Sequence, residues 1–253
     1  MKWPTRDVYE SIGHPFQSGT KLQALLPDQF PKNSQEITYA FQTAPNQDQG
    51  LYFQHFPTDK TIRTTLTEVD AELRPIHTLP PNVQTLSADP RSDEDIVHKF
   101  PFRAEVVMPE KPDSLYSLLT ELVEKDGSVS DSIVQIYYIP GKVIHAEMST
   151  DKAVYTAGDE LQLKITNHGP TNLTHHGRMY DLEIKKGDNW KVLNKKAVTY
   201  MTLEGYAPIT VGSYSQNIKL PDNLQPGTYR IVKSVGADLT NYGTTLSVAF
   251  EVQ

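Results

Sequence analysis

The fold is indicated most clearly by the stretch Leu224-Gln225-Pro226-Gly227-Thr228-Tyr229-Arg230-Ile231-Val232. The Pro-Gly pair predicts a turn, and the β-rich run that follows it predicts a strand. Tyr229 stands two residues past Gly227, as in the tyrosine corner of a Greek-key β-sandwich, where the tyrosine hydroxyl bonds back to the turn backbone. We therefore predict an all-β chain in which Leu224, Gly227 and Tyr229 form a structural tyrosine corner.

Length and charge limit the number of domains and the class of partner. The chain has 253 residues, and at roughly 100 residues per sandwich that is room for two domains. Its net charge is −7, and its 24 Lys and Arg residues are scattered along the sequence. Nucleic acids and anionic membranes attract basic patches, so we expect neither as a partner.

Cysteine usage and hydropathy bear on the compartment. The sequence has no cysteine, which is typical of domains exported into an oxidising space. It has no run of about 18 apolar residues that could form a membrane-spanning helix. Residues 1–6 are not followed by the apolar region of a signal peptide. We expect an extracellular or cell-surface protein whose targeting segment is absent from this sequence; a cytosolic protein is the alternative.

Alternating apolar residues and turn signals divide the chain into a leader and two strand-rich parts. Residues 1–30 are polar and rich in Pro, Gly and Gln, and they predict an extended leader. Residues 31–140 are expected to form a first β-sandwich and residues 141–253 a second, with the boundary at Pro140-Gly141. In the second part, turn signals recur roughly every 8–12 residues, the spacing expected of sandwich strands.

Two segments of the first part are harder to interpret. The leucines of residues 114–124 fit helical spacing, but the turn Asp126-Gly127 and a clear strand at residues 133–139 follow them. We therefore predict a strand at residues 114–124 as one arm of a hairpin, with a short helix as the alternative. Residues 75–90 contain several prolines and an acidic end, and they are predicted to be a loop.

The two parts end in similar strand-turn-strand units. One unit runs from Tyr116 to Ile139, and another of the same length runs from Tyr229 to Val252. The alignment of the two units superimposes the apolar residues Ile133, Tyr137 and Ile139 on Leu246, Phe250 and Val252. Tandem copies of one sandwich would produce this pattern; chance similarity between β-rich segments is the alternative.

A family pattern is carried by residues 155–167, 180–183, 190–192 and 224–233. Together these segments resemble bacterial immunoglobulin-like domains, which occur in secreted proteins and lipoproteins of Gram-positive bacteria. The resemblance covers about residues 143–253 and implies an immunoglobulin-like sandwich at the cell surface, while saying little about function. The layout is also similar to the intracellular proteinase inhibitors of bacilli. We predict two tandem antiparallel immunoglobulin-like β-sandwiches.

No residue pattern in the sequence predicts catalysis, a metal or a cofactor. His168, His175 and His176 share one predicted loop, but adjacent residues of a strand point to opposite faces, so we interpret them as solvated. The acidic residues 89–95 lack the glycine of a calcium loop. The chain has neither a cysteine nor a Gly-x-Ser-x-Gly motif, which leaves no nucleophile signature. We predict a protein that is not an enzyme and binds no cofactor or metal.

Aromatic residues are the best candidates for a binding surface. Residues 51–56 have apolar side chains on both faces of a predicted strand, and Pro45 and Pro57 flank the run as expected of an edge strand. At a second site two adjacent tyrosines must point to opposite sides of their sheet. Packing against the other domain is the alternative for both sites. The predicted binding residues are Tyr52, Phe53, Phe56, Tyr137 and Tyr138.

The function predicted from these observations is a non-catalytic binding or spacer module of a bacterial cell-surface or secreted protein. Its partner would be a protein or a cell-envelope polymer, and the chain would be a monomer or a weak dimer. One alternative is a proteinase inhibitor that presents residues 200–212, with Pro208 inside the loop, to a protease. Another is an enzyme that acts on envelope polymers through a pair of carboxylates.

Overall fold

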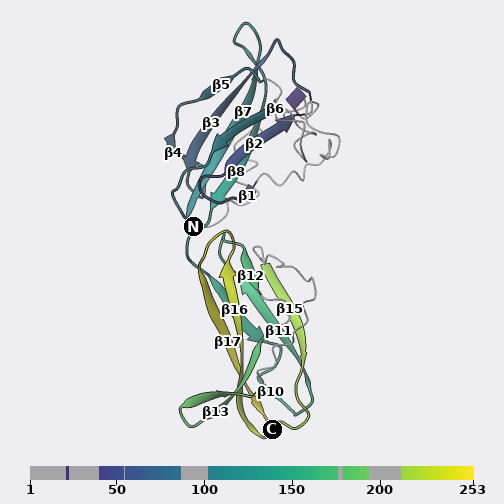
Figure 1. Cartoon of the computed structure of the whole chain (residues 1–253). Coiled ribbons are helices and arrows are strands. Elements are labelled where there is room, and N and C mark those ends of the chain that lie inside the picture. The colour runs from purple at the N-terminus through teal and green to yellow at the C-terminus, as the bar shows by residue number, and fades with distance from the viewer. Residues whose placement is uncertain (1–20, 23–39, 54, 87–101, 176–178, 194–211) are drawn as a thin grey trace, which may run out of the picture. The chain divides into compact units, whose positions relative to one another are not determined.

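The chain is all-β and divides into two compact units (Figure 1). The computed structural model describes residues 21–22, 40–53, 55–86, 102–175, 179–193 and 212–253. The first unit ends at Ile139 and the second runs over Pro140–Gln253. Within these described ranges no helix is long and apolar enough to span a membrane. The leader predicted for residues 1–30 lies outside the described residues except for Lys21 and Leu22.

The first unit is a sandwich of a six-stranded and a two-stranded sheet. The larger sheet has the order β1-β8-β7-β3-β4, with β5 also paired to β3, and the smaller sheet pairs β2 with β6. The strands of this unit are β1 (Ala40–Gln42), β2 (Asp48–Phe53), β3 (Thr61–Val69), β4 (Pro75–Thr78), β5 (Asn82–Gln84), β6 (Phe102–Val107), β7 (Ser114–Val123) and β8 (Val129–Ile139).

The second unit is a sandwich of a six-stranded and a three-stranded sheet. The larger sheet has the order β10-β17-β16-β13-β14, with β12 also paired to β16, and the smaller sheet has the order β15-β11-β9. The strands of this unit are β9 (Ala146–Thr150), β10 (Val154–Tyr155), β11 (Glu160–Asn167), β12 (Leu173–His175), β13 (Asp181–Lys186), β14 (Asn189–Val192), β15 (Gly212–Lys219), β16 (Gly227–Ala237) and β17 (Gly243–Val252).

The larger sheets of the two units share one strand arrangement. A short strand, β1 or β10, pairs in parallel with the last strand of its unit, β8 or β17. The last strand then pairs antiparallel with the strand before it, and Tyr116 faces Tyr137 in the first unit just as Tyr229 faces Phe250 in the second. The alignment predicted for the two terminal units is therefore confirmed in its register.

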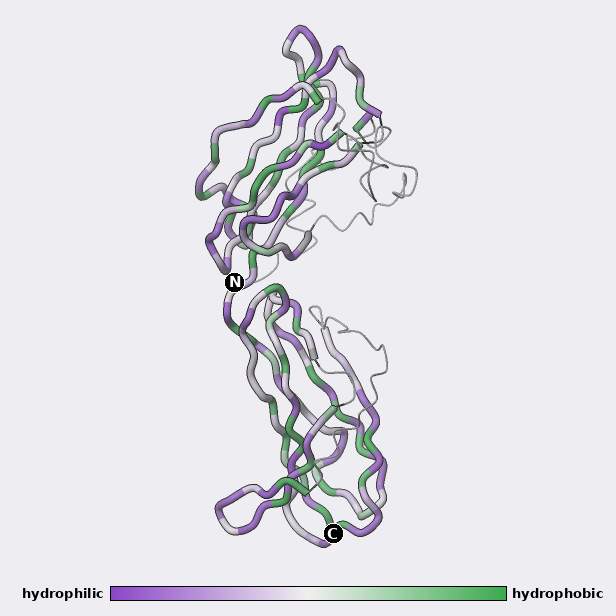
Figure 2. Tube along the Cα trace, viewed as in Figure 1, coloured by the Kyte–Doolittle hydropathy of each residue, from purple (hydrophilic) through white to green (hydrophobic). Residues whose placement is uncertain are grey.

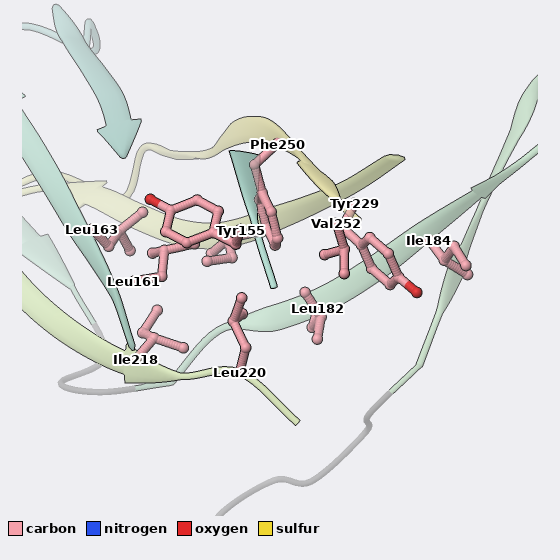
Figure 3. Packing of buried hydrophobic residues seen from close by; sticks show 11 residues of the cluster. Tyr155, Leu161, Leu163, Leu182, Ile184, Ile218, Leu220, Tyr229, Phe250 and Val252 are labelled. Atoms are coloured by element: carbon pink, nitrogen blue, oxygen red, sulfur yellow. The ribbon is translucent and has the colours of Figure 1, made fainter. Parts of the chain in front are cut away.

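Strict alternation of apolar residues builds the core of the second unit. On β11, Leu161, Leu163 and Ile165 are fully buried, and the residues between them are exposed. The aromatic rings add specific contacts, with Tyr155 and Phe250 edge to face at 5.4 Å between centroids, an arrangement that aromatic pairs prefer. Figure 3 shows these side chains converging from both sheets on one apolar cluster.

The Pro-Gly turn before β16 has the geometry of a tyrosine corner. The hydroxyl of Tyr229 donates a hydrogen bond to the carbonyl oxygen of Gln225 at 2.6 Å. Gly227 has a φ of 155°, a value open mainly to glycine because it lacks a Cβ atom. Leu224 packs against the apolar cluster that contains the Tyr229 ring. The turn is thereby tied to the core by one hydrogen bond and one apolar contact.

The prediction of a loop at residues 75–90 is wrong in its first half. β4 and β5 both pair with the same side of β3, at opposite ends of that strand. Prolines masked this signal, since a proline cannot donate a ladder hydrogen bond, but they are tolerated on edge strands. The segment at residues 114–124 forms the strand β7 as predicted.

Candidate functional site

The aromatic side chains Phe53 and Phe56 are buried, which contradicts their prediction as binding residues. They are 0% and 7% exposed, and their ring centroids lie 5.6 Å apart within one apolar cluster. The strand β2 ends at Phe53, so the alternation of faces does not extend to Phe56. Both rings therefore belong to one core cluster, and neither of them forms an exposed aromatic face.

Tyr137 and Tyr138 are also buried and are wrong as exposed binding residues. They lie on opposite sides of β8, in two separate apolar clusters, and are 2% and 0% exposed. The expectation that one of them faces solvent failed because both faces of the sheet are covered at this point. The hydroxyl of Tyr138 donates to the Asp113 carboxylate at 2.9 Å, and burial raises the pKa of the Tyr137 phenol.

Tyr52 is the one predicted binding aromatic that is partly exposed. The Arg103 guanidinium lies 5.7 Å from the centre of its ring, close enough for a cation–π contact. Burial and a hydrogen bond with Glu105 raise the pKa of the Tyr52 phenol to about 12. With its four aromatic companions buried, Tyr52 stands as a single side chain rather than as part of an aromatic surface.

The histidines, the acidic residues and the inhibitor loop considered in the sequence analysis can be checked only in part. His168 lies at 3.2 Å from the Glu147 carboxylate, and the described residues contain no group of three or more side chains that could hold a metal ion. The acidic residues 89–95 lie outside the described residues, as does the predicted inhibitor loop at residues 200–212 except for Gly212.

The second unit has a polar group in its core that the sequence analysis missed. Lys233 is 2% exposed and stands on β16 in the inward row between Ile231 and Val235. Its ammonium group donates to the carbonyl oxygen of Met179 at 2.8 Å and to Oε1 of Gln216 at 3.4 Å. Burial lowers the pKa of the Lys233 amine to about 8. The alternation along β16 was the signal that places this residue inside.

The most distinctive surface of the second unit is the β13–β14 hairpin, which extends away from the rest of that unit (Figure 1). Its turn is closed by Gly187 with a φ of 61°. Lys185, Lys186 and Lys191 are all exposed, and Figure 2 shows a hydrophilic hairpin tip. We call these three residues the lysine cluster. The strand register places Lys186 and Lys191 on the face of Ile184, whereas Lys185 lies on the opposite face.

An aromatic side chain lies in the middle of this hairpin. Trp190 is partly exposed and pairs across the hairpin with Lys185, so both side chains lie on the outer face of the sheet. The Arg230 guanidinium sits 4.4 Å from the centre of the indole ring, and its Nε donates to the Glu183 carboxylate at 2.5 Å. The ring is thus held by a cation that is itself fixed by a carboxylate.

The lysine cluster shares its hairpin with three acidic residues, Asp181, Glu183 and Asp188. Glu183 is engaged with Arg230, which leaves Asp181 at the base and Asp188 in the turn. Among the ion pairs formed within the described part of the chain, none includes a member of the lysine cluster. The hairpin therefore carries exposed ammonium groups on both faces and one indole held by Arg230 on its outer face, and it is the best candidate for a contact surface.

Comparisons with known proteins agree with the architecture of the second unit. Residues 142–251 match a family model described as a bacterial Ig-like domain. No curated protein sequence matches the chain. The fold class of the chain is a mostly antiparallel β-sandwich in each unit, and the match of residues 142–251 supports the bacterial immunoglobulin-like domain that the sequence resemblance predicted.

Two solved structures from clostridia show weak similarity to the chain. A family 123 glycoside hydrolase from Clostridium perfringens is 20% identical, with 44% of this chain and 27% of that chain covered, at a TM-score of 0.26. The fibronectin(III)-like modules of Clostridium thermocellum CbhA are 12% identical, with 85% of this chain and 88% of that chain covered, at a TM-score of 0.29. TM-scores this low do not establish a shared fold.

Proposed function

We propose that the chain is a non-catalytic binding or spacer module of a bacterial cell-surface or secreted protein. The observation that supports this proposal most strongly is the match of residues 142–251 to the bacterial Ig-like domain family. Domains of this architecture carry function on surface loops and hairpins presented by a rigid sandwich. The β13–β14 hairpin fits that role, because it projects from its unit and carries charged groups engaged in no described ion pair.

The compartment is the part of this proposal that can be tested most directly. Intact cells that produce the protein are treated with an external protease, and the chain is followed with an antibody against the second unit. We expect the chain to be degraded, or to be found in the medium, while a cytosolic marker stays intact. Complete protection of the chain in intact cells, with degradation only after lysis, would refute a surface or secreted location.

A further inference from the structure

The apolar side chains between the two sheets of the first unit form two separate clusters, which we call the Phe53 cluster and the Tyr137 cluster. Both draw on the neighbouring strands β3, β7 and β8, and both also include residues of the facing sheet of β2 and β6 (Figure 1). On β3, β7 and β8 the members are Ile62, Leu122 and Ile133 in the Phe53 cluster and Leu66, Leu118 and Tyr137 in the Tyr137 cluster. The apolar interior is therefore interrupted at one level of the sheet.

A row of polar side chains lies at this interruption. On each of the three strands, the inward position between the two clusters is polar, and the residues are Thr64 on β3, Thr120 on β7 and Gln135 on β8. They are 1%, 0% and 8% exposed. Thr64 lies directly opposite Thr120, and Gln135 is a diagonal neighbour of Thr120 because Thr120 pairs with Ile133. Side chains in such positions reach one another, so we call these three residues the polar row.

The polar row has more hydrogen-bonding capacity than the protein around it satisfies. Oγ1 of Thr120 and Oε1 of Gln135 are buried and have no partner among the described residues. The hydroxyl of Thr64 donates to the carbonyl oxygen of Asn82 at 3.5 Å, which is longer than the usual range for a hydroxyl donor. Buried polar atoms without a partner are costly and rare in native proteins. Two of them side by side are what a bound polar molecule would explain.

Water fits the chemistry of the polar row. Oε1 of Gln135 can only accept a hydrogen bond, whereas a threonine hydroxyl can donate or accept, so the bound molecule must be a donor. Buried waters typically make about three hydrogen bonds to groups that otherwise lack partners. On the facing strand β6, the boundary between the clusters falls between Ala104 and Val106. The methyl group of Ala104 fills little of the space at this level, which leaves room for a water molecule.

A metal ion fits the polar row less well than water does. The row itself carries no charge, and a cation buried away from water needs a compensating negative charge. Asp131 lies two inward positions further along β8 than Gln135, beyond Ile133. Its carboxylate accepts a hydrogen bond from the amide of Leu22 at 2.8 Å. This carboxylate is thus engaged at the far side of the Phe53 cluster.

We propose that the polar row binds an internal water molecule, which donates to Oε1 of Gln135 and bonds to the hydroxyls of Thr120 and Thr64. The water completes the hydrogen bonding of the interior where the two apolar clusters meet. The site lies inside the first unit and is independent of the surface function proposed above.

The test is oxygen-17 magnetic relaxation dispersion, which detects waters that stay inside a protein long enough to tumble with it and does not respond to exchange of hydroxyl protons. The full chain is compared with the double variant Thr120→Val and Gln135→Met, which keeps the approximate size of both side chains and removes their hydrogen-bonding atoms. We expect the double variant to lose the contribution of about one long-lived water. An equal dispersion in the parent and the folded double variant would overturn the proposal, because a direct bond between Thr120 and Gln135 would leave no water to lose.

A matched control separates a local site from a general effect of the substitutions. The control pair Thr65→Val and Gln162→Met makes the same chemical changes on the other face of β3 and at an exposed position of β11. The control should keep the dispersion of the parent. A loss as large as that of the double variant would show that the water is not held by the polar row.

Two single variants keep the test informative if the double variant does not fold. Gln135→Met removes the group that can only accept and should also lose the water, whereas Thr120→Ser keeps the hydroxyl and should retain it. Calorimetry establishes that each variant is folded. A folded Gln135→Met protein with the dispersion of the parent, or a folded Thr120→Ser protein without the water, would contradict the assignment.

Discussion

Replacing Lys233 by methionine should stabilise the second unit at neutral pH. The Lys233 amine is buried, and burial lowers its pKa from 10.5 to about 8. A shift of this size corresponds to about 3 kcal/mol of destabilisation whenever the amine is charged in the folded state. Lys233→Met keeps the length of the side chain and removes the charge. It also leaves the carbonyl of Met179 and the amide of Gln216 without this donor, which costs about 1–2 kcal/mol.

The expected net gain at pH 7 is therefore about 1–2 kcal/mol. The parent should behave differently from the variant as the pH rises. Between pH 8 and 10.5 the unfolded chain binds more protons at this amine than the folded chain does, so the parent's stability increases with pH. Buried tyrosines act in the opposite direction above about pH 10, since the phenol of Tyr52, for example, has its pKa raised to about 12 in the fold. The informative window is pH 7 to 10.

The assay is urea denaturation at several pH values in this window. Both proteins carry Trp3→Phe, because Trp3 and Trp190 are the two tryptophans of the sequence. The fluorescence of Trp190 then reports on the second unit. The stability difference between variant and parent should be largest at pH 7 and shrink toward pH 10. A variant that is less stable than the parent at pH 7, together with a parent whose stability does not change from pH 8 to 10, would refute this account of Lys233.

Three further substitutions test other parts of the fold. Tyr229→Phe removes the hydrogen bond to Gln225 and should destabilise the second unit by about 1 kcal/mol; an unchanged urea midpoint would show that the tyrosine corner contributes nothing. Phe53→Ala should destabilise the first unit by about 3–5 kcal/mol, because the ring is fully buried; a loss below 1 kcal/mol in calorimetry would contradict its core position. Leu239 has a φ of 57°, so Leu239→Gly should be neutral or stabilising by up to about 1 kcal/mol, and a lower melting temperature would count against strain there.

The strand pattern was predictable because the information is local. Alternation and turn residues along β11 and β16 reveal one buried and one solvated face without reference to the rest of the chain. The ambiguous segment that became β7 followed the same logic, since the turn after it required a hairpin partner. The edge strands β4 and β5 were missed because prolines interrupt them and their pairing with β3 is not encoded in any local period.

The binding aromatics were misplaced for a different reason. Tyr137 and Tyr138 do point to opposite faces of the sheet, as the alternation of side chains along a strand requires. That alternation does not indicate whether the second face is covered by other parts of the chain. The lysine cluster was missed because the hairpin pairing, which brings Lys191 onto the same face as Lys186, is not a local feature of the sequence. Lys233 was also missed, although the apolar row of Tyr229, Ile231 and Val235 on β16 places it on the buried face.

The parallel pairing of β10 with β17 gives the second unit a shear geometry toward tension applied at its two ends. Bonds from the amides of Glu251 and Gln253 to the carbonyl oxygens of Ala153 and Tyr155, at 2.9 and 3.0 Å, join these two strands. When the two ends of the unit are pulled apart, parallel strands slide along each other, so the bonds are sheared together instead of being peeled open one by one. β1 and β8 of the first unit also pair in parallel, so tension would shear the bonds between them in the same way. Forced unfolding depends on the height of the barrier, and a shear geometry suits a segment that must transmit force while staying folded.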